Sequence, residues 1–437
     1  MKELQSIIEE LKRTEPQEAR HALATIVKTS GSTYRRAGAR MLVMADGQTV
    51  GSISGGCLER DVGERARAVV ERGQPVVVKY DSTSSADIVW GLGLGCNGVV
   101  HILIEPLVCR NQLRDEANER QGSGFNYAEH TCHISFLEDC MRAREACVMA
   151  TVFGVEGNVE ARIGARLMLR TQSLPGDNGM PNGMPNGAAA KCDIKDFALA
   201  ARLLDDARES LHRRRSEVKR YDLPTGSVEV FLEVVEPPVP LVIFGAGHDA
   251  MPLAGFAKAL AYHVTVIDSR PAYLTKQRFA EADAMVLCRP ESVRQAVSIN
   301  AETVAVVMTH NYLHDKEILG ALLDSAAKYI GVLGPRRRTE RLLQELADEG
   351  VVPNDEILDR VYGPVGLDIG ADAPEQIALS IVAEIEAVLA NRAGESLRNR
   401  REPIHNHPTE SSEDSPAVQA CARGDAHPLS RAQEFQL

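Results

Sequence analysis

The residues best suited to chemistry are four consecutive ones, Ser54, Gly55, Gly56 and Cys57, within the segment GSISGGCLERDV. Two adjacent glycines let a ligand approach the backbone closely, and the residues that follow are typical of a helix. The free N–H groups and positive dipole end of such a helix would attract an anion and favour thiolate over thiol at Cys57. Because a thiolate binds soft metals and acts as a nucleophile, the pattern predicts an anion and metal site. The alternative is that Cys57 is a small buried hydrophobic residue in a tight strand-to-helix turn.

Two arginines, Arg35 and Arg36, lie upstream of this turn in the polar loop GSTYRRAG. A strand, HALATIVKT, is expected before the loop, and MLVMADGQTVGSIS after it is expected to form a hairpin that turns at Asp46 and Gly47. If the loop folds back over the hairpin, the two guanidinium groups add positive charge to the predicted anion site.

A second candidate site lies in the segment LVIFGAGHDA, which matches a strand followed by G-x-G-x-x-A. Gly245 permits a tight turn, Gly247 lets a phosphate approach the backbone, and the helix start offers unpaired N–H groups to a diphosphate. Asp268 ends the next predicted strand, where it could accept a hydrogen bond from a ribose hydroxyl. NAD(P) or another nucleotide is therefore a candidate ligand, although the same loop can persist as architecture alone.

Three histidines accompany this second site. His248 lies inside the glycine loop, where it could face a ligand or cap the helix. If the segment THNYLHD is helical, His310 and His314 would share one face of the helix, with Asp315 alongside. Such a pair could bind a metal ion, but ordinary loop hydrogen bonding explains it equally well, and the sequence marks no third ligand.

Residues 1–236 are expected to form an N-terminal α/β domain with an internal strand-loop-strand duplication. ATIVKTSGSTYRRAGARMLVM (24–44) resembles ATVFGVEGNVEARIGARLMLR (150–170), with the Ala-Thr and Gly-Ala-Arg pieces at the same spacing. The second copy lacks the SGGC turn and the paired arginines, so the first copy is expected to carry the site. An irregular insert with one short helix is expected at about 110–145, and a mobile loop with an MPNG repeat at about 174–191.

The segment EPPVP, at 236–240, marks the predicted boundary between two domains. Over residues 237–392 strands and helices alternate, which predicts a Rossmann-like, doubly wound parallel sheet with helices on both faces. Residues 393–437 are rich in Glu, Ser, Pro, Asn and Arg and show little apolar periodicity, so a disordered tail is expected there.

The composition is that of an acidic globular protein, with 437 residues, 44% hydrophobic residues and a formal net charge of −12. This charge would repel nucleic acid and anionic lipid, so any anion must be bound by local groups. No segment approaches the roughly 18–20 apolar residues of a membrane span, and no secretory signal is evident. Nine cysteines without a CxxC pair favour reduced thiols over a disulfide framework or structural zinc site, so a cytoplasmic location is expected.

Several motifs, in order along the chain, resemble those of the XdhC/CoxI family: GSTYRRAGARMLV, GSISGGCLERDV, GAGHDAMPLA, VTVIDSRPAYLTKQRF, VMTHNYLHD, YIGVLGPRRRTERLL and GPVGLDIGADAPEQIALSI. The resemblance covers residues 10–107 and 146–390 and departs from the family in the insert, the MPNG loop and the tail. It implies an accessory factor that binds molybdenum cofactor (molybdopterin), assists formation of its terminal sulfido ligand and delivers it to a molybdenum hydroxylase apoenzyme. Xanthine dehydrogenase and carbon monoxide dehydrogenase are hydroxylases of this type. Catalysis by the factor itself is not implied.

On this hypothesis Cys57 holds or protects the metal centre, while the glycines and nearby arginines hold the phosphate of the cofactor. The Rossmann-like domain would hold a nucleotide form of the cofactor, or the pterin would lie between the two domains. A sulfur-donating desulfurase is a candidate second partner, and a homodimer is plausible on general grounds.

Two other functions compete with this one. An NAD(P)-dependent oxidoreductase would use Gly245, Gly247 and Asp268, with His248 or His310 as acid–base, but no paired acid and base stands out at the expected hydride site. A nucleotide-sensing interaction module would bind nucleotide without molybdenum.

Overall fold

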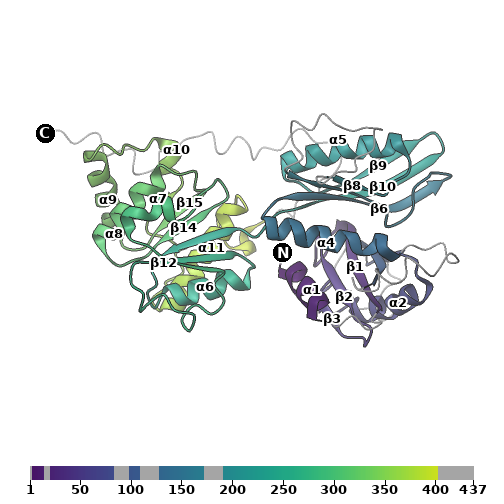
Figure 1. Ribbon diagram of the computed structural model, residues 1–437, viewed down its shortest axis with the longest axis horizontal. Helices are drawn as coiled ribbons and strands as arrows, with labels where there is room; N and C mark the ends of the chain where they lie inside the picture. The colour runs from purple at the N-terminus through teal and green to yellow at the C-terminus, as the bar shows by residue number, and fades with distance from the viewer. Residues whose placement is uncertain (1, 14–19, 83–97, 109–126, 172–189, 402–437) are drawn as a thin grey trace. The chain divides into compact units, whose positions relative to one another are not determined.

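The computed structural model describes residues 2–13, 20–82, 98–108, 127–171 and 190–401, which belong to two compact units divided between Pro237 and Pro238 (Figure 1). The first unit is the N-terminal domain and the second the C-terminal domain. The predicted MPNG loop lies almost entirely outside the described residues, as do the first part of the predicted insert and the tail beyond residue 401.

The first half of the N-terminal domain is built on an antiparallel sheet with strand order β3-β2-β1-β5-β4. Its elements are α1 (Lys2–Arg13), β1 (Arg20–Gly31), β2 (Arg40–Val43), β3 (Thr49–Gly51), α2 (Glu59–Arg72), β4 (Val76–Asp81) and β5 (Gly98–Val108). The predicted hairpin turn is confirmed, because β2 and β3 pair around Gly47, whose φ of 89° suits glycine. The helix α2 ends at a left-handed Gly73.

The second half repeats this arrangement, with strand order β8-β7-β6-β10-β9. Its elements are α4 (Tyr127–Ala143), β6 (Cys147–Gly157), β7 (Arg166–Arg170), β8 (Ala190–Cys192), α5 (Phe197–Arg213), β9 (Glu217–Leu223) and β10 (Gly226–Val235). The predicted duplication is therefore confirmed, and it extends from one strand-loop-strand unit to a whole sheet with its helices.

The prediction of an irregular insert at 110–145 is wrong for its second part, because residues 127–143 form the regular helix α4. This helix precedes β6 as α1 precedes β1, and it contributes Phe136, Leu137 and Cys140 to the same hydrophobic cluster that contains α1. Its polar residues obscured the apolar spacing that would have predicted a full helix.

The two sheets face each other, and α2 and α5 cover their outer faces (Figure 1). Alternation along the strands produces these layers: Ala22, Ala24 and Ile26 of β1 pack with α2, whereas Val27 packs with Phe231 of the second sheet.

Two buried ion pairs join the halves reciprocally. Arg40 of the first copy donates to both carboxylate oxygens of Glu233 in the second copy. Arg166, the residue equivalent to Arg40, donates from Nη2 to Oε1 of Glu105 in the first copy at 2.5 Å. All four residues are at most 6% exposed. Buried charges require such partners, so these pairs specify how the halves assemble.

The C-terminal domain is a six-stranded parallel sheet with order β13-β12-β11-β14-β15-β16, the strand order of dinucleotide-binding folds. Its strands are β11 (Pro240–Phe244), β12 (His263–Asp268), β13 (Ala284–Leu287), β14 (Val304–Val307), β15 (Tyr329–Val332) and β16 (Val361–Tyr362). Its helices are α6 (Ala250–Ala259), η4 (Pro290–Ser292), α7 (Val293–Ala296), α8 (Tyr312–Leu323), α9 (Arg336–Asp348), α10 (Asp355–Leu358), α11 (Pro374–Leu389) and η5 (Leu397–Asn399).

Helices cover both faces of this sheet, as the sequence predicts. The helices α6 and α11 pack on one face, and α7, α8 and α9 pack on the other. The fold class is thus confirmed as mixed α/β with a doubly wound parallel sheet. The segment 393–401, predicted to begin the disordered tail, contains the short helix η5.

Candidate functional site

The SGGC turn connects β3 to α2 and depends on glycine at both middle positions. Gly55 and Gly56 have φ values of 76° and 121°, a region that side chains disfavour. A Cβ atom at Gly55 would lie 2.8 Å from Cε1 of Tyr34, whereas one at Gly56 would meet no atom within 4 Å. The turn is therefore packed on the Tyr34 side and open at Gly56.

The N–H groups of this turn are already used by Glu59, the first residue of α2. Its Oε1 accepts hydrogen bonds from the backbone N–H groups of Ile53 and Ser54, at 3.2 and 2.9 Å. Its Oε2 accepts from those of Gly56 and Leu58, at 2.9 and 3.2 Å. The prediction that these groups are free for a ligand is wrong in this structure, because the chain supplies the anion itself.

Side-chain donors complete the surroundings of Glu59. The hydroxyls of Ser52 and Ser54 also donate to its carboxylate, and the Ser54 hydroxyl accepts from Leu58 N–H at 2.7 Å. Burial alone would raise the pKa of Glu59, but the hydrogen bonds from Ser54, Ser52 and the backbone outweigh it and lower the pKa to about 2. Glu59 is therefore ionised at neutral pH, and in this structure Ser54 helps to hold it in place.

Cys57 is exposed, which rules out the alternative of a buried hydrophobic residue. The helix begins two residues after it, at Glu59, rather than at Cys57 itself. The predicted positive field at the thiol is opposed by the Glu59 carboxylate, which neutralises the same N–H groups. The turn therefore presents an accessible soft donor beside an open glycine.

The predicted arginines are not the nearest contacts of the turn. Arg35 forms a two-point ion pair with Glu3 of α1, with Nη1–Oε1 and Nη2–Oε2 distances of 2.7 Å. Arg36 is exposed in the same loop. The loop does fold back, but it does so through Tyr34, which touches Gly55 and is 64% exposed. The sequence analysis did not single out Tyr34. The only indication of its role was its position next to Arg35 and Arg36.

The second glycine loop has the predicted geometry at Gly245 and Gly247. Gly245 has a φ of 117°, and its Cβ would lie 2.4 Å from the Met308 carbonyl, so only glycine fits. Arg278 supports the loop by donating from Nη2 to the carbonyl oxygens of Ala246 and Gly247, at 3.0 and 3.1 Å. The loop thus has the conformation expected of a dinucleotide-binding turn.

A carboxylate also lies beside Gly247 in this loop. Asp249 accepts from Ala250 N–H at 3.1 Å and places Oδ1 2.5 Å from where a Cβ of Gly247 would lie. Its Oδ2 lies 2.8 Å from Nε2 of His310. The N–H of Ala250 is thus engaged by Asp249 rather than unpaired, and His248 is exposed while Asp249 caps the helix.

Asp268 is saturated by its own neighbours. It accepts from Ala246 N–H at 2.7 Å, and from the backbone N–H, Nε and Nη2 of Arg270 at 2.8 to 2.9 Å. Burial tends to raise the pKa of Asp268, but these hydrogen bonds and the Arg270 charge lower it. The predicted ribose acceptor is thus engaged, since Arg270 would have to move before Asp268 could bind a hydroxyl.

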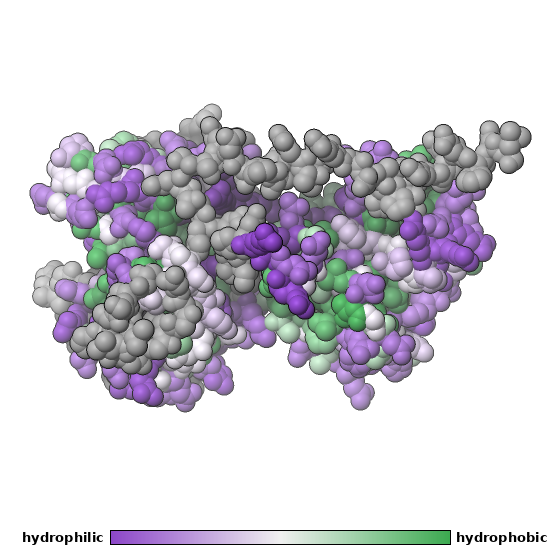
Figure 2. Space-filling model, turned by 180° about the vertical axis from the view of Figure 1, so that it is seen from behind, coloured by the Kyte–Doolittle hydropathy of each residue, from purple (hydrophilic) through white to green (hydrophobic). Residues whose placement is uncertain are grey.

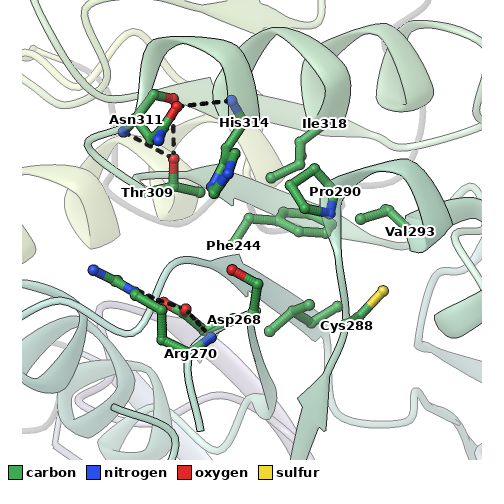
Figure 3. Close-up of a pocket in the computed structure, with 12 residues that line it drawn as sticks. Phe244, Asp268, Arg270, Cys288, Pro290, Val293, Thr309, Asn311, His314 and Ile318 are labelled. Atoms are coloured by element: carbon green, nitrogen blue, oxygen red, sulfur yellow. Dashed lines mark hydrogen bonds and ion pairs between the residues drawn. The ribbon is translucent and has the colours of Figure 1, made fainter. Parts of the chain in front are cut away.

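A cavity of about 90 Å³ opens beside Asp268 at the carboxyl edge of the sheet, where such folds bind ligands. Figure 3 shows the Asp268–Arg270 pair on one side and His314 on the other. The apolar lining comes from Phe244, Ile267, Pro290, Val293 and Ile318. Of the predicted residues, this cavity therefore combines Asp268 and His314.

His310 and His314 do not form the predicted pair on one helix face. The helix α8 begins at Tyr312, and His310 precedes it with a φ of 59°. Asp315 is buried and bonded to Thr309 and Arg338. Within the described residues no cluster of three or more His, Cys, Asp or Glu side chains could hold a metal ion.

Comparison with known proteins places these two glycine turns in recognised regions. A model of the XdhC and CoxI family matches residues 16–81, and a model of the XdhC Rossmann domain matches residues 241–385. The chain is also 33% identical over 363 residues to a protein of Bacillus subtilis (strain 168) named as a probable xanthine dehydrogenase subunit, spanning 83% of this chain and 91% of that protein. This chain belongs to the XdhC and CoxI family.

Two further similarities extend across most of this XdhC/CoxI-family protein. It is 21% identical over 377 residues to the molybdenum cofactor insertion chaperone PaoD of Escherichia coli (strain K12), covering 86% of this chain and 85% of PaoD. A crystal structure described as a xanthine dehydrogenase from Bacillus halodurans is similar with a TM-score of 0.65 and 29% identity, covering 91% of this chain and 98% of that one. The predicted family is therefore confirmed.

Proposed function

We propose that this XdhC/CoxI-family chain binds molybdenum cofactor as cargo, assists its sulfuration and delivers it to the apoenzyme of a xanthine dehydrogenase-type hydroxylase. Near-full-length similarity to relatives named as a probable part of xanthine dehydrogenase and as a cofactor insertion chaperone supports the role. A sulfur-donating desulfurase is the proposed second partner, and the cytoplasm the proposed location. The chain acts as a carrier rather than as a catalyst.

The observation that carries this proposal is the exposure of Cys57 beside the open side of the SGGC turn. A thiolate is a soft ligand suited to molybdenum or to its sulfur ligands. Gly56 leaves room on the adjoining backbone, since a Cβ there would meet nothing within 4 Å. We assign Cys57 the role of contacting the metal centre of the cargo and Tyr34 that of flanking it.

The phosphate of the cargo cannot bind to the free N–H groups of this turn, because four of them already donate to Glu59. A phosphate therefore binds here only by displacing the Glu59 carboxylate, or it binds elsewhere on the chain. The thiol contact does not depend on that displacement, so metal retention and phosphate retention are separable.

The oxidoreductase alternative has less support from the C-terminal domain. Asp249 places negative charge beside Gly247, where the sequence predicts the approach of a phosphate, and Arg270 covers the acid that would bind the ribose. Binding of a dinucleotide would require both contacts to be replaced. Cofactor transport remains the function that the described geometry supports best.

The function is tested by producing the full chain in cells that make molybdenum cofactor and measuring bound molybdenum, pterin and nucleotide. We expect molybdenum and pterin in a fixed ratio to protein, and activation of a xanthine dehydrogenase-type apoenzyme when the loaded chain is added. Nucleotide without molybdenum would favour the sensing module, and nicotinamide turnover would favour the oxidoreductase. Either result would contradict the proposal.

A further inference from the structure

The cavity beside Asp268 lies where the parallel sheet reverses its direction of winding. From β11 the chain passes through α6, on one face, to β12, and from β13 it passes through α7, on the other face, to β14. Strands β12 and β14 therefore flank β11, and open parallel sheets bind ligands at such points. The walls of the cavity are mostly apolar, with side chains from Phe244, Ile267, Pro290, Val293 and Ile318. A ligand bound here would bury apolar surface.

Three polar side chains that also line the cavity have unused hydrogen-bonding groups. Asn311 accepts at Oδ1 from the backbone N–H groups of Leu313 and His314, at 3.0 and 3.2 Å, and its amide Nδ2 has no partner among the described residues. Within the same residues, the Ser269 hydroxyl and the His314 imidazole have no hydrogen-bond partner either. Figure 3 shows Asn311 and His314 together at the start of α8. These groups can donate and accept, so a ligand with a polar edge would satisfy them.

The opposite charges of Asp268 and Arg270 cancel at the edge of the cavity. The guanidinium donates from Nε to Oδ1 of Asp268 at 2.9 Å and from Nη2 to Oδ2 at 2.8 Å. A phosphate placed beside this pair would gain little net attraction. A wholly apolar ligand fits no better, because it would bury the polar groups of Ser269, Asn311 and His314 without partners. The lining therefore favours an uncharged ligand with apolar faces and a polar edge.

The size of the cavity limits the ligand further. A closed cavity of roughly 150 Å³ can hold benzene. This cavity measures about 90 Å³ and is open to solvent, so it has room for one six-membered ring, with the rest of the ligand outside. The heterocyclic bases of nucleosides match this description, because they have apolar faces that stack on side chains and an edge of hydrogen-bond donors and acceptors.

We propose that this cavity binds the heterocyclic base of a nucleoside. The base enters between the apolar walls, its edge bonds to Ser269, Asn311 and His314, and the sugar and any phosphates stay outside. This mode differs from dinucleotide binding, because Asp268 and Asp249 keep their present hydrogen bonds. Phosphate groups therefore add little to the affinity. The inference does not depend on the proposed cargo.

Calorimetric titration of the full chain tests the proposal. The probes are adenosine, guanosine, cytidine and uridine, their 5′-mono- and diphosphates, ribose 5-phosphate and neopterin. We expect at least one nucleoside to bind, its phosphorylated forms to bind with the same affinity within about threefold, and ribose 5-phosphate not to bind. The proposal is overturned if no nucleoside binds or if neopterin binds more tightly than every nucleoside. A diphosphate that binds more than about tenfold more tightly than its nucleoside would also overturn it, since the glycine turn would then supply the affinity.

Two substitutions at the end of β13 locate the binding site. Cys288 lines the cavity, so Cys288→Phe should fill it and abolish binding of the nucleoside. Leu287 is the preceding residue, 60% exposed and absent from the lining, so Leu287→Phe should leave the affinity unchanged. Nucleoside binding that survives Cys288→Phe would place the site elsewhere and overturn the proposal. Titration of the unsubstituted chain remains decisive if Cys288→Phe fails to fold.

Alkylation of Cys288 gives a second readout on the unsubstituted chain. At a nucleoside concentration about ten times the Kd, only about a tenth of the cavities stay empty, so iodoacetamide should modify Cys288 about tenfold more slowly. The exposed Cys57 belongs to the other domain and serves as the internal control, with no change in its rate. Equal rates at Cys288 with and without a bound nucleoside would contradict the proposed site.

Discussion

Glu59 and Asp249 have the same role in two turns of unrelated sequence. Each turn exposes backbone N–H groups at a helix start, and each carboxylate accepts hydrogen bonds there, so the chain fills its own anion sites. A phosphate that binds at either of these two turns must compete with these residues. On the proposed function, this competition would make the binding of an anionic cargo reversible.

The charge of Glu59 should stabilise the N-terminal domain above its unfolded pKa. Its pKa is about 2 in the folded chain against 4.5 for an ordinary glutamate, so the stabilisation is complete above pH 4.5 and is lost as the pH falls towards 2. Because Glu59 is only half-buried, solvent screening limits the effect to about 1 kcal/mol. Glu59→Gln should lower the melting temperature at pH 7, and the difference from wild type should shrink below pH 4.5. A difference that does not vary with pH would contradict this account.

For these two turns, the sequence predicted where backbone N–H groups would be available for hydrogen bonding. It did not predict which side chains would accept those hydrogen bonds. Glycines report conformational freedom directly, so the turns at Gly55 and Gly245 were predictable. A carboxylate that accepts hydrogen bonds from a preceding turn is harder to recognise from the sequence. Asp249, immediately before its helix, is a standard capping residue and could have been predicted, whereas Glu59 could not be separated from ordinary first-turn acids.

We expect the charge of Asp249 to oppose binding of a diphosphate at the β11–α6 turn. Asp249→Asn keeps a capping side chain but removes the charge, so binding of NAD(P) should strengthen by about tenfold, or about 1.4 kcal/mol. Isothermal titration of the full chain with NAD and NADP, for wild type and variant, measures the change. Unaltered affinity would show that the carboxylate does not oppose the ligand.

At the level of secondary structure, the sequence predicted only part of the duplication, namely the strand-loop-strand unit and not the whole sheet. The Gly-Ala-Arg pieces revealed equivalent strands, and they contain Arg40 and Arg166. Their acidic partners, Glu233 and Glu105, lie in strands far along the chain, and each arginine pairs with the acid of the other copy. Reciprocal pairing between the two copies depends on how the two sheets pack together. This packing cannot be predicted from a local sequence pattern.

The ion pair between Arg40 and Glu233 should couple strongly in a double-mutant cycle. Either Arg40→Met or Glu233→Gln leaves a buried charge without its partner, at a cost of about 3–5 kcal/mol. The double substitution should cost less than the sum of the two, because it removes both charges together. Denaturant unfolding of the four proteins measures the coupling. Additive losses would mean that the pair does not fix the assembly of the halves.

The molecule as a whole is acidic, so its long-range field cannot attract an anionic cargo. Figure 2 shows hydrophilic and hydrophobic residues interspersed, with the largest hydrophobic cluster of this view on the C-terminal domain. Across the described ranges, no helix has the length and apolar character needed to cross a bilayer. On the proposed function, cargo binding would therefore rest on local groups, among which we propose the exposed Cys57.

The molybdenum content of Cys57→Ser tests this central claim most directly. The variant, the unsubstituted chain and a Cys192→Ser control are produced together in cells that make the cofactor, and metal per chain is measured. We predict that Cys57→Ser loses most of its molybdenum while melting at the same temperature as wild type, and that the control keeps its metal. Equal molybdenum in all three proteins would contradict a role for Cys57 in holding the cargo.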